Sequence, residues 1–195
     1  MTWYVVDGMD GCGKTTCADI IKRKLESEGR RVFLVTHPDT GCLAGRLENA
    51  YLHKEGKLFK LLSTLFYIID VLESLAHMVV HRKDYDDFIF VRYLMAVAYL
   101  PERLQKKAYR IISGILPMPD EAILVDVDAE TSMRRILERG EDLEAFENME
   151  DLTRVRNSML SLSEGWTVVD NSSPMDDVKA RLEEHVDGVL RGLSR

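Results

Sequence analysis

The chain has 195 residues, of which 46% are hydrophobic and 30% charged, a composition typical of one globular domain. A formal net charge of −7 argues against a broad basic surface that would bind nucleic acid. The longest apolar stretch, residues 61–80, is interrupted by Asp70, Glu73 and His77, and these polar residues exclude a membrane span. The three cysteines lack metal-ligand spacing and no leader precedes the first apolar run, so we expect reduced thiols and a cytoplasmic protein.

Five short apolar runs are predicted to be strands, at residues 3–7, 31–36, 88–91, 123–127 and 166–169. They are continuous rather than alternating, which is typical of strands covered on both faces. Helical patterns lie at residues 15–28, 43–51, 56–81, 93–116, 129–138 and 149–162, and from Pro174 onward. Pro101 is expected to interrupt the fourth helix and Gly29 to end the first. This alternation predicts one α/β domain over residues 1–195, built on a parallel sheet.

A glycine-rich segment, GMDGCGKT at residues 8–15, joins the first predicted strand to the first predicted helix. It matches the P-loop pattern G-x-x-x-x-G-K-S/T, whose backbone N–H groups cradle phosphates at the positive end of a helix. Lys14 is expected to reach the β- and γ-phosphates, and Thr15 to ligate Mg²⁺. The predicted ATP-binding residues are Gly8, Asp10, Gly11, Cys12, Gly13, Lys14, Thr15 and Thr16.

The string VVDGMDGCGKTT, with Asp10 inside the loop, resembles the opening of thymidylate kinases. Later segments follow the order of that family: HPDTGCLAGR, LFYIIDVLESL, FVRY and PDEAILVDVDAETSMRRILERG. The resemblance implies a P-loop kinase-type five-stranded parallel β-sheet flanked by α-helices, with a small lid at about residues 138–151. It also implies transfer of the γ-phosphoryl group of ATP to a nucleoside monophosphate, and a homodimer formed through the long apolar helix.

The resemblance assigns roles to several charged residues. Asp10 would contact the acceptor or cap the loop, and Lys14 with Mg²⁺ would hold the donor. Arg92 would donate to the acceptor phosphate beside the γ-phosphate, and Tyr93 would also bind the substrate. The alternative for Arg92 is an ion pair with a neighbouring acid such as Asp126. Because Gly11 occupies a loop position that can carry the family's arginine, the lid must supply one.

Three arginines precede or enter the lid, and all three are candidates for this role. Arg135 and Arg139, which we name as catalytic residues, lie four residues apart on one helical face. The alternative is a solvated face on which these arginines pair with Glu130, Glu138 and Glu141. Arg134 is the third arginine of this segment.

The acceptor side departs from the family pattern. The aspartate of its Asp-Arg-Tyr segment is Val91 here, and Asp7 is expected to take over part of its role toward Mg²⁺. His37 replaces an arginine-bearing segment and would contact a phosphate weakly near neutral pH.

A polar stripe marks the long helix, because Phe66, Asp70, Glu73 and His77 share one face. We interpret it as a wall of the acceptor cleft, with Phe66 stacking on the base. Asp70 there would favour a base edge with an amino donor, which suggests an acceptor other than dTMP. The alternatives are a plain solvent face or a metal site.

Two other functions compete with a nucleoside monophosphate kinase. One is a kinase for a nucleoside or another small molecule, and the other is a catalytically degenerate ATP-binding protein. Val91 and the altered acceptor residues favour these alternatives, whereas Lys14, Thr15 and the lid arginines oppose the second.

Overall fold

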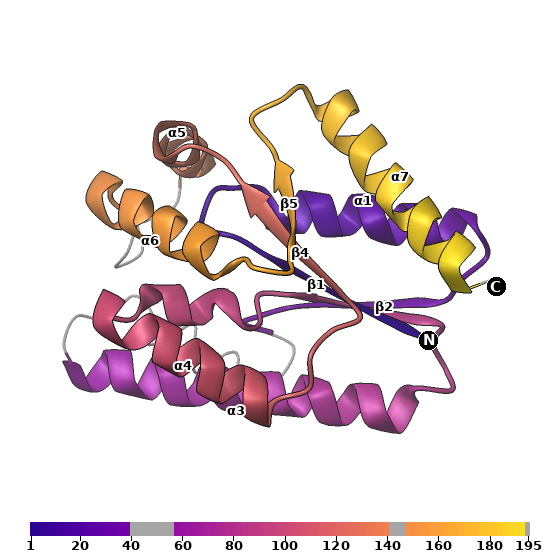
Figure 1. Ribbon diagram of the computed structural model, residues 1–195, viewed down its shortest axis with the longest axis horizontal. Coiled ribbons are helices and arrows are strands. Elements are labelled where there is room, and N and C mark those ends of the chain that lie inside the picture. Colours follow the sequence, from indigo (N-terminus) through magenta and orange to yellow (C-terminus); the bar gives the residue numbers. More distant parts are fainter. Residues whose placement is uncertain (40–56, 141–146, 194–195) are drawn as a thin grey trace.

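The computed structural model describes residues 1–39, 57–140 and 147–193, with only the backbone for residues 57–65. Its centre is a five-stranded parallel sheet in the order β2-β3-β1-β4-β5 (Figure 1). The strands are β1 (Thr2–Asp7), β2 (Val32–Thr36), β3 (Asp87–Val91), β4 (Glu121–Asp126) and β5 (Thr167–Asp170). The predicted α/β fold is confirmed, and each strand lies within two residues of its predicted bounds.

The helices are α1 (Lys14–Ser27), α3 (Lys57–His81), α4 (Glu102–Ile115), α5 (Ala129–Arg139), α6 (Met149–Leu162) and α7 (Met175–Leu193). The helix predicted at residues 43–51 lies outside the described residues. The segment predicted at 93–116 is broken at Pro101, as expected, but its first part is the 3₁₀ helix η1 (Met95–Tyr99). Gly29, at φ 76°, follows α1 in the left-handed conformation predicted for a helix end.

The central strands explain why the apolar runs are continuous. Every residue of β1 and β3 is buried, whereas the edge strands β2 and β5 are partly exposed. Val91 is fully buried and pairs in register with Val6 and Thr36 of the neighbouring strands. The valine at the end of β3, where the family pattern has an aspartate, is thus part of the hydrophobic core.

The helices lie on both sides of the sheet. In Figure 1, α1 and α7 lie on one side and α3 and α4 on the other. Val178, Leu182 and Val186 form the buried face of α7, which packs mainly on α1 and also contacts β5. No helix among the described residues is long and apolar enough to cross a bilayer.

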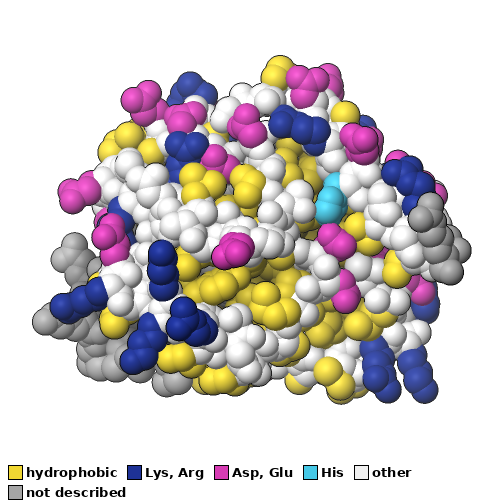
Figure 2. Space-filling model, viewed as in Figure 1, with side chains coloured by type: hydrophobic (Ala, Val, Ile, Leu, Met, Phe, Trp, Pro, Cys, Tyr) yellow, Lys and Arg dark blue, Asp and Glu magenta, His cyan; other side chains and the backbone are white. Residues whose placement is uncertain are grey.

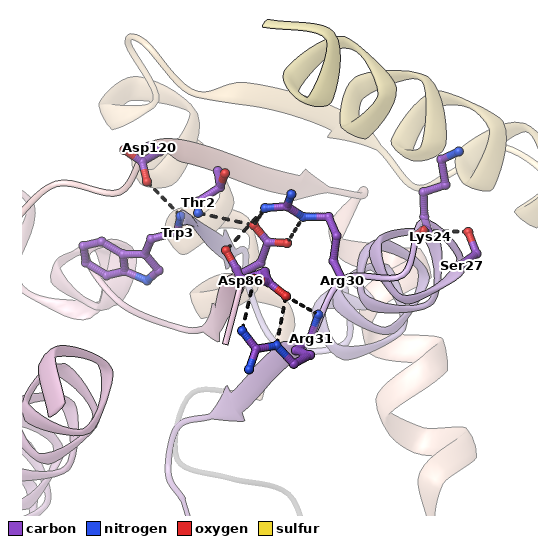
Figure 3. A network of polar contacts seen from close by, with 9 residues as sticks. Thr2, Trp3, Lys24, Ser27, Arg30, Arg31, Asp86 and Asp120 are labelled. Carbon is purple, nitrogen blue, oxygen red and sulfur yellow. Dashed lines mark hydrogen bonds and ion pairs between the residues drawn. The ribbon is translucent and has the colours of Figure 1, made fainter. Parts of the chain in front are cut away.

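An ion-pair network closes the amino end of the sheet (Figure 3). Arg30 binds both carboxylate oxygens of the fully buried Asp87, which also accepts from the backbone N–H of Thr2. Arg31 pairs with Asp86 at the surface. The carboxyl ends of the strands, where the phosphate loop begins, lie at the opposite end of the sheet, so this network stabilises the fold away from the loop.

Candidate active site

The phosphate loop connects β1 to α1 at the carboxyl edge of the sheet. Gly11 and Gly13 have φ angles of 71° and 92°, which favour glycine. A Cβ atom at Gly13 would lie 2.4 Å from Nδ2 of Asn171, and one at Gly11 would lie 2.6 Å from the carbonyl oxygen of Ser132. The glycines are thus required both by backbone conformation and by close packing against α5 and the end of β5.

Side-chain donors bind three carbonyl groups of this loop. Lys14 Nζ lies 2.6 Å from the carbonyl oxygen of Met9, and the Ser132 hydroxyl donates to that of Asp10. Asn171 Nδ2 lies 2.7 Å from the carbonyl oxygen of Cys12. Because these carbonyls are bound, the loop presents a less negative surface to an anion at the amino end of α1.

Asp10 is the electrostatic centre of the site. Its buried carboxylate binds the Arg92 guanidinium, accepts from the Tyr99 hydroxyl at 2.6 Å and lies 3.6 Å from Lys14 Nζ. Burial alone would raise the pKa of Asp10, but Arg92, Lys14 and the Tyr99 hydrogen bond outweigh it and hold that pKa well below its usual value. Asp10 is therefore ionised at neutral pH, between the cationic side chains of Lys14 and Arg92.

Arg92 reaches this centre from a tight turn after β3. Its own φ is 68°, in the left-handed region that residues other than glycine seldom adopt. The alternative that Arg92 pairs with a neighbouring acid is met by Asp10 and not by Asp126, whose two oxygens are bound by Arg156 at 2.8 Å. The structure thus brings Arg92 to the phosphate loop through an ion pair with Asp10.

Asp7 lies behind the loop with 1% of its surface exposed. Its Oδ2 atom accepts from the backbone N–H groups of Tyr93 at 3.0 Å and Met95 at 3.1 Å. Burial raises the pKa of Asp7 above its usual value, although these two hydrogen bonds and the nearby cations oppose the shift. The carboxylate predicted to serve Mg²⁺ thus faces the turn that carries Arg92.

The exposed hydroxyl of Thr15 is the feature of the phosphate loop that suits magnesium. Thr15 and Thr16 are exposed in the first turn of α1, directly after Lys14. Within the described ranges, no group of three His, Cys, Asp or Glu side chains could hold a metal ion. A hydroxyl beside bound phosphates fits Mg²⁺, which usually takes few protein ligands and retains waters and phosphate oxygens.

The candidate lid arginines differ in their contacts. Arg135 reaches the phosphate loop, with Nη1 3.4 Å from the carbonyl oxygen of Cys12 and Nη2 3.0 Å from that of Asn171. Arg139 binds the buried Glu147 at 2.6 Å across the undescribed residues 141–146. Arg134 is 66% exposed and lies 4.0 Å from Glu138, as the solvated alternative predicts.

On the acceptor side, His37 and Asp70 form a buried pair. His37 Nδ1 lies 2.9 Å from Asp70 Oδ2, which also accepts from the backbone N–H of Asp39 at 2.9 Å. The stripe of α3 that we interpret as a wall of the acceptor cleft therefore does not lie in one environment. Asp70 is buried against the end of β2, whereas Glu73 is exposed.

The other residues predicted on the acceptor side are His77, Phe66 and Tyr93. His77 stacks on Phe33 of β2, with ring centroids 4.4 Å apart. Phe66 is half-buried, and the Tyr93 ring packs edge-on against Trp3 while its hydroxyl donates to the carbonyl of Pro117. Tyr93 thus anchors the segment after β3 through the core.

Sequence reasoning missed Tyr99, Ser132 and Asn171, all of which contact the phosphate loop. Asn171 directly follows the fifth strand, and polar residues there could have been examined because the carboxyl ends of parallel strands share one edge. For Tyr99 and Ser132, the sequence carries no comparable signal, since each lies within a helical pattern far from the loop along the chain.

Comparison of the amino-acid sequence with known proteins identifies its family. A family model described as thymidylate kinase matches residues 6–182. The chain is 28% identical to the probable thymidylate kinase of Pyrobaculum aerophilum, over 98% of this chain and 99% of that protein. It is 28% identical to that of Archaeoglobus fulgidus over 95% and 94%, and 30% identical to the thymidylate kinase of Xanthomonas euvesicatoria pv. vesicatoria over 89% and 77%. The chain therefore belongs to the thymidylate kinase family of nucleoside monophosphate kinases.

Proposed function

We propose that this protein transfers the γ-phosphoryl group of ATP to dTMP. The observation that carries the proposal is the cluster at Asp10, where Lys14 of the phosphate loop and Arg92 from the end of β3 meet at one carboxylate. A donor phosphate on Lys14 and an acceptor phosphate on Arg92 would then lie side by side. Bringing two anions together between fixed cations is the main task in phosphoryl transfer.

The remaining residues complete the donor side. Thr15 would hold Mg²⁺, which supplies charge neutralisation to the phosphates. Arg135 would stabilise charge on the transferring group, since it is the candidate arginine whose guanidinium reaches the loop. Arg139 would pair with Glu147 within the lid segment. Gly8, Gly11, Gly13 and Cys12 would cradle the phosphates through their backbones.

The acceptor base is proposed to be thymine, because the relatives are named thymidylate kinases and because of the position of Asp70. The case for an amino-bearing base required an open Asp70 carboxylate. That carboxylate is buried and hydrogen-bonded to His37 and to the backbone of Asp39, which removes the support for another base. Phe66 remains the proposed stacking residue.

The test is ADP formation from ATP and Mg²⁺ with a panel of acceptors: dTMP, dUMP, dCMP, dAMP, dGMP and thymidine. We expect the highest kcat/KM with dTMP. A preference for dCMP or dAMP would contradict the assigned base, and a preference for thymidine would show a nucleoside kinase. Tight ATP binding without transfer to any acceptor would show a degenerate enzyme.

We also propose a homodimer in the cytoplasm. The support for the dimer is α3, on which Val79 is 64% and Val80 73% exposed beside exposed Ile68, Ile69 and Leu72. Hydrophobic side chains line the lower margin of the molecule in Figure 2, below the centre of the sheet, where α3 runs in Figure 1. The buried free thiols of Cys12 and Cys17 support a reducing compartment. Light scattering that gave the 22.3 kDa monomer mass at micromolar concentration would contradict the dimer.

A further inference from the structure

The backbone N–H groups of the turn after β3 donate to the end of β1, the neighbouring strand in the sheet. The N–H of Arg92 donates to the carbonyl of Val6 at 3.1 Å, so the turn starts as a continuation of the β1–β3 ladder. The N–H groups of Tyr93 and Met95 then turn toward one side-chain atom, Oδ2 of Asp7, at 3.0 and 3.1 Å. A single carboxylate oxygen thereby replaces the β-ladder where β3 ends.

This carboxylate determines where the Arg92 side chain points. Arg92 lies between the last ladder bond and the two Asp7 bonds, at a φ of 68° that an arginine does not adopt without support. In that conformation its guanidinium reaches the carboxylate of Asp10, in the loop that begins directly after Asp7. The loop and Arg92 are thus both attached to the end of β1.

We propose that Asp7 is a positioning residue for Arg92, and that it acts on the acceptor side of the reaction and not as a ligand of the metal. The proposal rests on the proposed function, because it takes Arg92 as the group that binds the acceptor phosphate. Two observations carry it: the Oδ2 atom of Asp7 is engaged by two backbone donors, and the side chain is 1% exposed. A hard cation with retained waters needs open carboxylate oxygens, which this burial does not offer.

A residue that positions Arg92 and a residue that binds Mg²⁺ should respond differently to the substitution Asp7→Asn. The amide oxygen of asparagine accepts the same two N–H bonds, but a neutral amide is a poor substitute for a carboxylate at Mg²⁺. Asp7→Ala removes the acceptor altogether. As a control we choose Asp120→Ala, which removes a side-chain acceptor from the backbone N–H of Trp3, 2.8 Å away, at the opposite end of the sheet.

The experiment measures KM for dTMP, calorimetric affinity for dTMP, the Mg²⁺ concentration for half-maximal activity and the melting temperature of each protein. For D7N we expect dTMP affinity within about threefold of the wild type, since the hydrogen bonds remain. For D7A we expect dTMP affinity and KM to worsen on the order of 10-fold or more, because Arg92 is displaced. The half-maximal Mg²⁺ concentration should stay within about twofold in both. D120A should lower the melting temperature and leave dTMP affinity unchanged.

Several results would overturn the proposal. A large rise in the Mg²⁺ requirement of D7N would assign Asp7 to the metal, and this result decides the question even where D7A does not fold. Unchanged dTMP affinity in D7A would also contradict it. Crystal structures of D7N and D7A separate this idea from the proposed function: an Arg92–Asp10 pair retained in D7A overturns the positioning role whether or not the wild type phosphorylates dTMP.

Discussion

Nδ1 of His37 lies 2.9 Å from Oδ2 of Asp70, and the two side chains, 0% and 1% exposed, link the end of β2 to the middle of α3. Two titratable groups so deeply buried are stable only as partners. The pair lies where the sequence suggested an open acceptor wall. Its function in the structure is to hold α3 against the sheet, and hence to place Phe66 one turn away.

Removal of the Asp70 carboxylate should therefore destabilise the fold. Asp70→Ala leaves the His37 ring and the Asp39 amide without this acceptor, which we expect to lower the free energy of unfolding by about 1–3 kcal/mol. Urea denaturation measures the change. The matched control is Asp84→Asn, at the exposed His81–Asp84 pair, whose effect should be too small to resolve. Equal losses in the two variants would contradict a structural role for the buried pair.

Lys14 should be essential for transfer. Lys14→Ala removes the cation that contacts Met9 and Asp10, and we expect kcat/KM to fall by on the order of 10³ because charge on the transferring phosphoryl group is no longer neutralised. Steady-state ADP formation measures this loss. Lys22→Ala, on the exposed part of the same helix, should retain wild-type kinetics. A K14A enzyme within tenfold of the wild type would refute the assignment of this loop as the donor site.

Arg135 and Arg134 form a natural comparison, because they are adjacent on α5 and only Arg135 reaches the loop. We expect Arg135→Ala to lower kcat/KM for ATP by about 10–100-fold, and Arg134→Ala to have no measurable effect. Arg139→Ala should act mainly on stability, since it leaves the buried Glu147 carboxylate without this ion pair. Loss of kcat in R139A together with normal kinetics in R135A would move the catalytic role to Arg139.

Arg30 should be important for stability and irrelevant to activity. Arg30→Ala leaves the fully buried Asp87 without its guanidinium partner, and we expect a loss of about 3 kcal/mol in the free energy of unfolding. Arg31→Ala next to it removes only the surface pair with Asp86 and should change stability far less (Figure 3). Denaturant unfolding of both variants checks this difference. A change in KM for ATP or dTMP in R30A would contradict the separation of this network from the active site.

The donor half of the site was predictable because it is local. The phosphate loop is one continuous segment between a strand and a helix, so its residue types alone determine which N–H groups can bind an anion. The five strands were predictable for a similar reason: continuous apolar runs reflect burial on both faces, and β1 and β3 are buried throughout.

The acceptor half was not predictable in the same way, because its contacts join residues far apart in the chain. Helical spacing predicts that Asp70 and His77 share one face of α3, but it does not reveal that His37 lies opposite Asp70. Likewise, nothing in the pattern of residues 93–116 indicates that the Tyr99 hydroxyl meets Asp10.

The sequence by itself determined the phosphate loop, the alternation of strands and helices, and the resemblance to thymidylate kinases. Only the tertiary structure decided that Asp7 faces the turn carrying Arg92, that Arg135 reaches the loop and that Asp70 is buried. The physical reason is the strand order β2-β3-β1-β4-β5, which places the carboxyl ends of nonconsecutive strands side by side. Periodicity shows which face of an element is buried, whereas strand order determines which side chains that face meets.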